Sequence, residues 1–353
     1  MRPEPPVAHG YRMPAEWETH AATWLAWPHN TDTWPDQLVQ VQMIYGHIIT
    51  ALQAREAVHL LVNDASTAAR VRHLLALPHL DQPHLTLHQL PTADAWLRDS
   101  GPIFLTSMAA SVPPLALVDW CFTAWGGKYE ELMIDDHLPQ HMARILGLPC
   151  FRPGIVLEGG SIDVNGRGSC LTTEQCLLHP NRNPHLKRAD IEQALYDYLG
   201  VHHVIWLGQG IVGDDTDGHV DDIARFVNPT TVVCALTDDP QEVNYAVLQD
   251  NYRRLQAATD QDGHPLQVIP LPLPSQVGFP TELLPASYAN FYIGNGVVLV
   301  PIYNHPHDQV ALTILQDVFP HRRVIGIPCE PLVQGLGAIH CITQQQPVTT
   351  AMP

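Results

Sequence analysis

The sequence predicts an α/β fold of repeated units, each made of two antiparallel strands, a helix and a third strand (ββαβ). Two observations carry this prediction. Runs rich in β-branched residues, separated by turn-forming residues such as Asn-Gly or Asn-Pro, recur along the chain and are typical of β-hairpins. Each hairpin is followed by an amphipathic helical stretch and then by a short apolar run. With 45% hydrophobic and 15% charged residues, the 353-residue chain can bury a large core.

Three copies of this unit can be traced through the second half of the chain. Their predicted hairpins are 161–164 with 170–173, 223–227 with 231–236, and 291–293 with 297–303. Their helices are expected at 184–199, 240–258 and 306–319, and their third strands at 203–207, 266–271 and 323–327. Proline stands near the start of each helix, where its missing N–H is tolerated. A further copy has strands at 101–105 and 115–118 and a helix around 130–146.

The two ends of the chain supply the parts of a fifth copy. The segment 337–344 looks like a first strand without the rest of its unit. The N-terminal region offers a strand at 22–27, a helix at 35–54 and a strand at 58–62. We therefore expect the terminal strands to pair and close the chain on itself, as one domain spanning residues 1–353. The alternative is an open α/β sheet with independent hairpin insertions, which the repeats alone do not exclude.

The charge balance narrows the class of partner. Lys and Arg number 18 and Asp and Glu number 36, which gives a formal net charge of −18 with His neutral. Phosphate backbones are bound by clustered basic side chains, so nucleic acid is excluded as the main partner. An acidic protein attracts small cations instead.

Membrane, disulfide and metal chemistry are not indicated. No apolar run approaches the ~18 residues of a membrane-spanning helix, and the first residues lack the apolar block of a secretory leader. We therefore expect a cytoplasmic protein without membrane association. Seven cysteines, an odd number with no C-x-x-C pair, indicate reduced thiols. The 21 histidines form no H-E-x-x-H motif, so no metal site is predicted.

Residues at the predicted strand starts could do chemistry if ring closure brings them together. Cys341 follows a glycine-rich stretch at 335–340 that permits close backbone approach, and a thiolate is a strong nucleophile. The other six cysteines are interpreted as small buried hydrophobes. His219 is the expected general acid or base, because the pKa of an imidazole lies near neutrality.

Carboxylates surround His219 in the sequence. The segment 213–222 holds five aspartates, whose mutual repulsion calls for a cation or a basic partner. An EF-hand calcium loop is the alternative, but the spacing and terminal Glu of that pattern are not met. If Asp221 and His219 share a strand, the two-residue period places them on one face, and Arg225 has the same parity.

Two more acids lie at strand starts. Asp99 follows Trp96 by three residues, and Glu158 precedes a Gly-Gly pair. Either acid could be an ordinary solvated or ion-paired residue. Together, a thiol, an imidazole and three carboxylates describe a pocket for a planar cation with several N–H donors, such as a guanidinium.

Motifs spread from residue 13 to residue 347 carry a family resemblance. They are Met13-Pro14-Ala15-Glu16-Trp17-Glu18, Thr23-Trp24-Leu25-Ala26-Trp27-Pro28, Trp96-Leu97-Arg98-Asp99, Glu158-Gly159-Gly160-Ser161, Gly213-Asp214-Asp215-Thr216, Gly218-His219-Val220-Asp221 and Gly335-Leu336-Gly337-Ala338-Ile339-His340-Cys341. In combination they closely resemble the agmatine deiminases, in the bacterial-type peptidylarginine deiminase group of the guanidino-modifying superfamily.

The resemblance implies a five-bladed α/β-propeller with pseudo-fivefold symmetry and a homodimer or higher assembly. It implies Cys341 as the nucleophile, His219 as the general acid and base, and Glu158 as the residue that orients His219. Asp99 and Asp221 would hold the guanidinium nitrogens, and Trp96 would line the pocket. The implied reaction is hydrolysis of agmatine to N-carbamoylputrescine and ammonia through an amidino-thioether on the cysteine, with no metal or organic cofactor.

The far end of the substrate is interpreted from the loop at 121–128. This loop holds Lys128 but no arginine pair for a carboxylate, which favours a tail ending in ammonium, with Asp214 or Asp215 as its partner. Two residues depart from the family pattern: Thr123 replaces Asn and Asp217 replaces His. A deiminase of free or peptidyl arginine, an amidinotransferase and a non-catalytic polyamine-binding protein stay open as alternatives.

Overall fold

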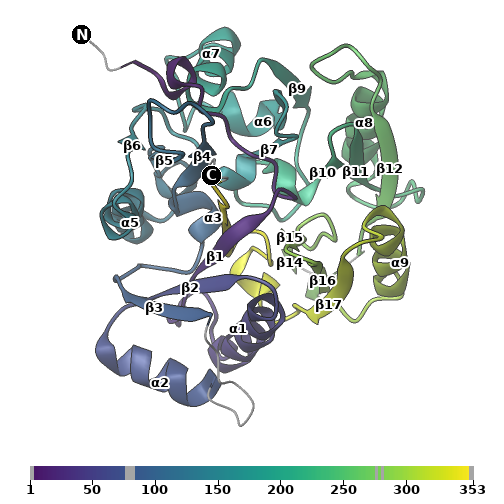
Figure 1. Cartoon of the computed structure of the whole chain (residues 1–353). Coiled ribbons are helices and arrows are strands. Elements are labelled where there is room, and N and C mark those ends of the chain that lie inside the picture. Colours follow the sequence, from purple (N-terminus) through teal and green to yellow (C-terminus); the bar gives the residue numbers. More distant parts are fainter. Residues whose placement is uncertain (1–3, 76–83, 275–276, 280–281, 350–353) are drawn as a thin grey trace.

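The computed structural model describes residues 4–75, 84–274, 277–279 and 282–349. Within them, five sheets of three or four strands follow one another around the molecule in chain order (Figure 1). The predicted boundaries of a single domain, 1–353, extend into residues outside this set. None of the helices in the described ranges is long and apolar enough to cross a membrane.

Four of these sheets have three strands in the same arrangement, an antiparallel hairpin followed by a parallel third strand. They are β4 (Ile103–Thr106), β5 (Leu115–Val118) and β6 (Cys150–Phe151); β7 (Ile162–Val164), β8 (Ser169–Thr173) and β9 (His203–Leu207); β10 (Ala224–Asn228), β11 (Thr231–Leu236) and β12 (Gln267–Pro272); β15 (Tyr292–Gly294), β16 (Val297–Ile302) and β17 (Arg323–Pro328). The helices before the third strands are α5 (Leu138–Leu146), α7 (Arg188–Leu199), α8 (Tyr245–Ala257) and α9 (Asp308–Val318). The predicted ββαβ units are confirmed.

The first and last strands pair and complete the fifth unit. β18 (Thr343–Pro347) lies antiparallel to β1 (His20–Ala26), which is followed by α1 (Leu38–Gln53) and the parallel strand β2 (Ala57–Val62). Figure 1 shows purple β1 beside the yellow C-terminal segment. This pairing confirms the predicted closure and overturns the alternative of an open sheet with insertions.

The third strands β6, β9, β12 and β17 lie farther from the centre of the molecule than the hairpins of their units (Figure 1). Every residue of the hairpin strands β5, β7 and β8 is buried, whereas the third strand β17 is mostly half-buried or exposed. Buried apolar side chains of the hairpins therefore form the interior, which agrees with the apolar runs in the sequence.

Several features differ from the sequence predictions; for example, the helix expected from residue 184 begins at Arg188. Most of the segment 337–344 is not a strand, because β18 begins only at Thr343 and Cys341 lies in the turn before it. The helix expected from residue 240 begins at Tyr245, after a series of turns. The first sheet also gains a fourth strand: α2 (Ala65–Leu75) leads to β3 (Leu85–Gln89), parallel to β2.

Short turns of helix precede the first strands of several units. The single-turn helices are α3 (Leu97–Ser100), α4 (Ala124–Gly127) and α6 (Glu174–Leu177). The 3₁₀ helices span Pro6–His9, Glu130–His137, Gly159–Ser161, Val220–Asp222 and Val333–Gly335. Apart from these helices, the short strand β13 (Gly278–Phe279) pairs with β14 (Glu282–Leu283). Among the helical turns, α3 precedes β4, the 3₁₀ helix Gly159–Ser161 precedes β7 and the 3₁₀ helix Val220–Asp222 precedes β10. Four residues predicted to be functional, Asp99, Glu158, His219 and Asp221, lie on or beside these turns.

Candidate active site

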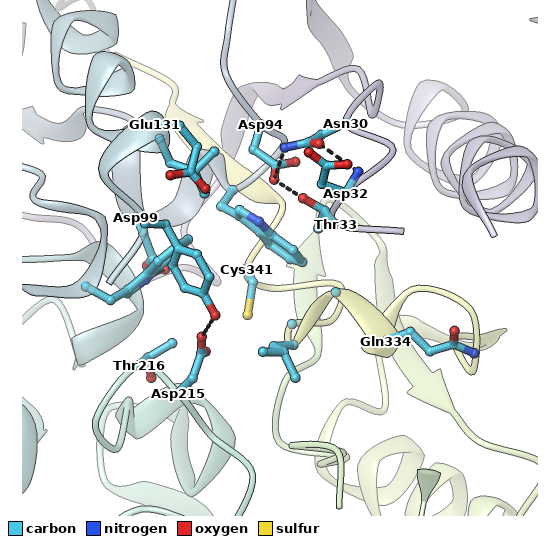
Figure 2. A pocket seen from close by; sticks show the side chains of 17 residues that line it. Asn30, Asp32, Thr33, Asp94, Asp99, Glu131, Asp215, Thr216, Gln334 and Cys341 are labelled. Carbon is cyan, nitrogen blue, oxygen red and sulfur yellow. Dashed lines mark hydrogen bonds between the residues drawn. The ribbon is translucent and has the colours of Figure 1, made fainter. Parts of the chain in front are cut away.

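A cavity of about 250 Å³ contains the side chain of Cys341 in its wall. Figure 2 shows its sulfur between Asp99 and Asp215 on one side and Gln334 on the other. The lining includes five acids, Asp32, Asp94, Asp99, Glu131 and Asp215. None of the described residues that line the cavity is Lys, Arg or His. The lining therefore favours a cationic ligand.

Three predicted side chains converge at Gly160, next to Cys341. A Cβ atom added to Gly160 would lie 2.6 Å from His219 Nδ1 and 3.0 Å from both Asp221 Oδ2 and Asp99 Oδ1. Asp221 Oδ2 is also 3.9 Å from Cys341 Sγ. The structure therefore brings Asp99, His219, Asp221 and Cys341 into one cluster, and the missing side chain of Gly160 leaves room for it.

Each of these residues is held by the turn that precedes the first strand of its unit. Asp99 lies on α3, His219 is the N-cap of the 3₁₀ helix before β10, and Cys341 lies in the turn before β18. Asp221 lies on the same 3₁₀ turn, so the two residues do not share a strand and the two-residue period does not apply to them. The helical turn, not the strand period, places both side chains toward Gly160.

Glu158 lies on the opposite edge of the His219 ring. Its Oε2 is 3.8 Å from His219 Nε2, and its Oε1 accepts a hydrogen bond from Arg182 Nε at 2.8 Å. All three residues are buried. Burial raises the pKa of Glu158, but Arg182 and His219 outweigh it and hold that pKa below its usual value. Glu158 is therefore an ionised partner for His219. The sequence analysis did not identify Arg182.

The imidazolium form of His219 is favoured by its neighbours. Burial opposes that charge, but Asp99, Cys176 and Glu158 outweigh burial and raise the pKa of His219 well above its usual value. An imidazolium persists at neutral pH and can donate a proton to a leaving group.

The surroundings of Cys341 disfavour the charged form of its thiol. Burial and then the carboxylates of Asp221, Asp222 and Asp99 raise its pKa well above the usual value. A cation bound among these carboxylates would offset their field and favour the thiolate. A bound cation is therefore what would favour the thiolate of Cys341 in this site.

The predicted substrate-binding residues divide into two groups. Trp96 and Asp215 line the cavity, and Asp215 Oδ2 accepts a hydrogen bond from Tyr129 at 2.6 Å. Asp214 is not among the described lining residues. Its carboxylate accepts from Thr216 N at 2.8 Å and His219 N at 3.1 Å, because the tight loop folds it back onto backbone N–H groups. These bonds show that Asp214 holds the loop in place.

The glycine-rich stretch before Cys341 packs on aromatic rings. A Cβ atom on Gly337 would lie 2.4 Å from the ring of Trp96, and one on Gly335 would lie 2.5 Å from Trp34 Nε1. These glycines therefore let the backbone approach two tryptophans that support the cavity.

The two departures from the family pattern lie where two loops meet. Thr123 Oγ1 accepts from Gly126 N at 3.3 Å, and Asp217 pairs with Lys128 Nζ at 2.8 Å. Burial raises the pKa of Asp217, but bonds from Asn181, Lys128 and Arg182 outweigh it and lower that pKa to about 2. Neither Thr123 nor Asp217 is among the described lining residues.

A buried ionic network lies beneath the cluster. His340 Nδ1 lies 2.7 Å from Asp221 Oδ2, and His340 Nε2 lies 2.8 Å from Glu16 Oε2. Glu16 also pairs with Arg98 Nη2 at 3.3 Å and Arg225 Nη2 at 2.9 Å. Arg225 Nε also lies 3.4 Å from Asp163 Oδ1, so its guanidinium pairs with two buried acids. His340 and Glu16 stand in the quoted motifs, but no local pattern in the sequence links them.

Two groups in the described ranges have donor atoms close enough for a metal: Glu158 with Cys176 and His219, and Asp260 with Asp262 and His264. In the first, Arg182 already supplies a positive charge to Glu158. In the second, the Asp260 carboxylate accepts from the backbone N–H groups of the other two residues at 2.9 Å. In both groups, interactions with other parts of the chain therefore explain why these side chains lie together.

Comparisons with known proteins agree with this geometry. The family model described as Porphyromonas-type peptidyl-arginine deiminase matches residues 12–347. The chain is 39% identical to the agmatine deiminase of Stutzerimonas stutzeri, covering 97% of both chains, and 37% identical to that of Medicago truncatula, covering 97% of this chain and 98% of the relative. The solved agmatine deiminase of Enterococcus faecalis superposes with a TM-score of 0.91 at 36% identity, covering 98% of both chains. The chain therefore belongs to the Porphyromonas-type peptidyl-arginine deiminase family.

Proposed function

We propose that this protein is an agmatine deiminase, which hydrolyses agmatine to N-carbamoylputrescine and ammonia. The observation that carries the proposal is the acid-lined cavity around Cys341, whose described lining residues include no basic side chain. A guanidinium offers paired N–H donors to carboxylates, and agmatine ends in a second cation. The carboxylate of free arginine would face acids instead of a basic partner.

In the first half of the reaction, Asp99 and Asp221 hold the guanidinium nitrogens beside Cys341. The bound cation offsets these carboxylates, so the thiol loses its proton to solvent and the thiolate attacks the guanidinium carbon. His219 as imidazolium then protonates an amino group of the tetrahedral intermediate, and ammonia leaves. An amidino-thioether remains on the cysteine. The 3.9 Å approach of Asp221 Oδ2 to Cys341 Sγ supports this placement.

In the second half, the now neutral His219 takes a proton from water, and the hydroxide attacks the amidino carbon. Collapse of this second intermediate expels the thiolate and leaves the ureido product, whose extra proton passes to solvent. Glu158, held by Arg182, stabilises the imidazolium in each half. The chemistry is complete with these side chains and water.

The tail ammonium is assigned to acids on the cavity wall other than Asp99, which holds the guanidinium. Asp215 lines the cavity and is oriented by Tyr129, and Glu131 lines it as an exposed side chain. Asp94 is less available, because its carboxylate already accepts bonds from Thr33 and from Ala95 N. We assign the tail to Asp215 and Glu131.

Ammonia and ureido product are measured with agmatine and with arginine at equal concentration. We expect agmatine to have the higher kcat/KM by on the order of 100-fold or more, because like charges placed together cost several kcal/mol. Equal turnover of arginine would contradict the assignment of the tail. Release of putrescine in place of the ureido product would indicate transfer of the amidino group to another acceptor.

A cytoplasmic location and self-association belong to the same proposal. Cell fractionation checks the location. Light scattering on the purified protein checks the assembly, for which a homodimer or larger oligomer is expected.

A further inference from the structure

Four of the five units deliver a proposed catalytic residue from the segment before their first strand: Asp99, Glu158, His219 and Cys341. The fifth unit, β15 to β17, has Asn290 in the corresponding place, two residues before Tyr292 begins β15. Asn290 is fully buried. It has no part in the mechanism above, although its position in the repeat is that of a functional residue.

Three partners fix the side-chain amide of Asn290. Its Oδ1 accepts from His340 N at 2.9 Å, and its Nδ2 donates to Asp222 Oδ1 at 3.0 Å. Because a backbone N–H can only donate, the amide oxygen must face His340, and this sets the orientation of the amide. Nδ2 then lies 3.2 Å from Cys341 Sγ.

The two hydrogens of Nδ2 can serve two acceptors at once. Asp222 takes one of them, which leaves the other for the sulfur. As a neutral thiol, Cys341 can donate instead to Oδ1, at 3.5 Å. Asn290 therefore offers a partner to both forms of the cysteine, an acceptor for the thiol and a donor for the thiolate.

The thiolate needs such a donor because acids surround it. Asp221, Asp222 and Asp99 all disfavour a negative charge on the sulfur. A hydrogen bond donated to an ionised acceptor is roughly twice as strong as a neutral one. The other hydrogen of the same amide is donated to Asp222 Oδ1 at 3.0 Å.

We propose that Asn290 is the fifth unit's catalytic residue: its Nδ2 donates to the Cys341 thiolate and stabilises it before attack and when it is expelled from the amidino-thioether. This inference deepens the proposed function and rests on Cys341 being the nucleophile. No new covalent step is involved, since the amide neither gains nor loses a proton.

The test compares two variants with a matched control. Asn290→Asp keeps an oxygen that accepts from His340 N but loses the N–H group that faces the sulfur. If the new carboxyl group carries a proton, that proton is shared with the Asp222 carboxylate and is not donated to the sulfur. Asn290→Ala removes both functions. The control is Asn251→Ala on α8, an equally buried asparagine whose amide bonds Gly208 N at 2.7 Å and Gln209 O at 2.8 Å.

The readout is the rate at which iodoacetamide alkylates Cys341 without substrate, followed from pH 7 to 10 by mass spectrometry of the peptide that contains it. Below the thiol pKa this rate follows the thiolate fraction. We expect both Asn290 variants to react about tenfold or more slowly at pH 8, equivalent to about one unit of thiol pKa. Their kcat for agmatine should fall at least as far with little change in KM, and Asn251→Ala should react like the parent protein.

Parent-like alkylation of Asn290→Asp, with its melting temperature retained, would overturn the proposal and leave Asn290 a purely structural residue. If Asn290→Asp does not fold, Asn290→Ala decides by the same comparison. Alkylation needs no substrate, so the outcome is independent of agmatine. Failure of the proposed function would instead show as a parent protein that releases no ammonia.

Discussion

Gly160 leaves the space in which the functional side chains meet. A methyl group there would lie 2.6 Å from His219 Nδ1 and 3.0 Å from two carboxylate oxygens. We expect Gly160→Ala to lower kcat/KM by on the order of 100-fold, because a displacement of ~1 Å at a reacting group costs about that much. Gly46→Ala is the control, since its added Cβ would meet Leu75 at an ordinary 3.6 Å. Equal activity of the two variants would contradict the placement of the site.

Glu158 sets the charge state of His219. Its carboxylate is one of the groups that raise the pKa of His219, so Glu158→Gln should lower that pKa. The imidazolium is then lost at a lower pH, and the alkaline limb of kcat/KM against pH should move to lower pH. Glu174→Gln, at a surface pair with Arg254, should leave the profile unchanged. An unshifted limb in Glu158→Gln would remove Glu158 from the mechanism.

At the scale of elements, the turn α4 illustrates how a strained segment is held at the site. Ala124, Trp125, Gly126 and Gly127 all have positive φ, from 47° to 84°. Left-handed backbone costs about 1–2 kcal/mol for a residue with a side chain. Trp125 Nε1 donates to Asp99 Oδ2 at 3.0 Å, and Lys128 pairs with Asp217. These contacts hold the loop against its strain and orient Asp99.

Trp125→Phe removes the hydrogen bond to Asp99 and keeps most of the ring. We expect kcat/KM for agmatine to fall about tenfold or more, the effect of losing ~1.5 kcal/mol or more from a bond to a charged group. Trp206→Phe loses the same kind of bond, from Nε1 to Glu192 at 2.8 Å, outside the described lining of the cavity. Its kinetics should match those of the parent, and a similar loss in both would point to general destabilisation.

Elements with local signals were predictable from the sequence. Leu115–Val118 and His203–Leu207 form strands with the predicted limits, because short apolar runs between turns need no distant information. The error at 337–344 has a physical cause. Its apolar residues Ala338, Ile339 and Ile342 are buried like those of a strand, but the backbone turns there, and β18 starts later. The additional pair α2 and β3 was missed because it departs from the repeat.

The proposed catalytic residues were predictable only where a motif carried them. Cys341, His219 and Glu158 stand in such motifs, and the structure gathers them with the predicted carboxylates. Their supporting partners were not found. Arg182 contacts Glu158 across 24 residues, and Asn290 contacts Cys341 across 51. The first contact forms within one unit and the second between neighbouring units. Both arise only when the chain folds, so no local spacing in the sequence indicates them.

At the scale of the whole molecule, Glu16 ties the units together at the buried centre. It pairs with Arg98 before β4 and Arg225 on β10, accepts from Ile293 N on β15 at 2.8 Å, and contacts His340 before β18. Removing one member of a buried ionic group leaves the others without compensation. The N-terminal segment is therefore part of the core that closes the ring.

Glu16→Ala should lower the free energy of unfolding by about 3–5 kcal/mol, because two buried guanidinium groups lose a partner. Denaturant unfolding followed by circular dichroism measures this. Glu18→Ala is the control, since its pair with Arg12 is partly exposed and should contribute at most about 1 kcal/mol. A loss in Glu16→Ala no larger than that in Glu18→Ala would contradict the role of the ionic network.

The covalent adduct tests the account most directly. The protein is mixed with agmatine, quenched in acid within one turnover and digested, and the peptide that contains Cys341 is weighed. We predict a gain equal to the mass of agmatine less ammonia, and neither adduct nor product in Cys341→Ala. Turnover of agmatine by Cys341→Ala would contradict the attack of this thiol on the guanidinium carbon.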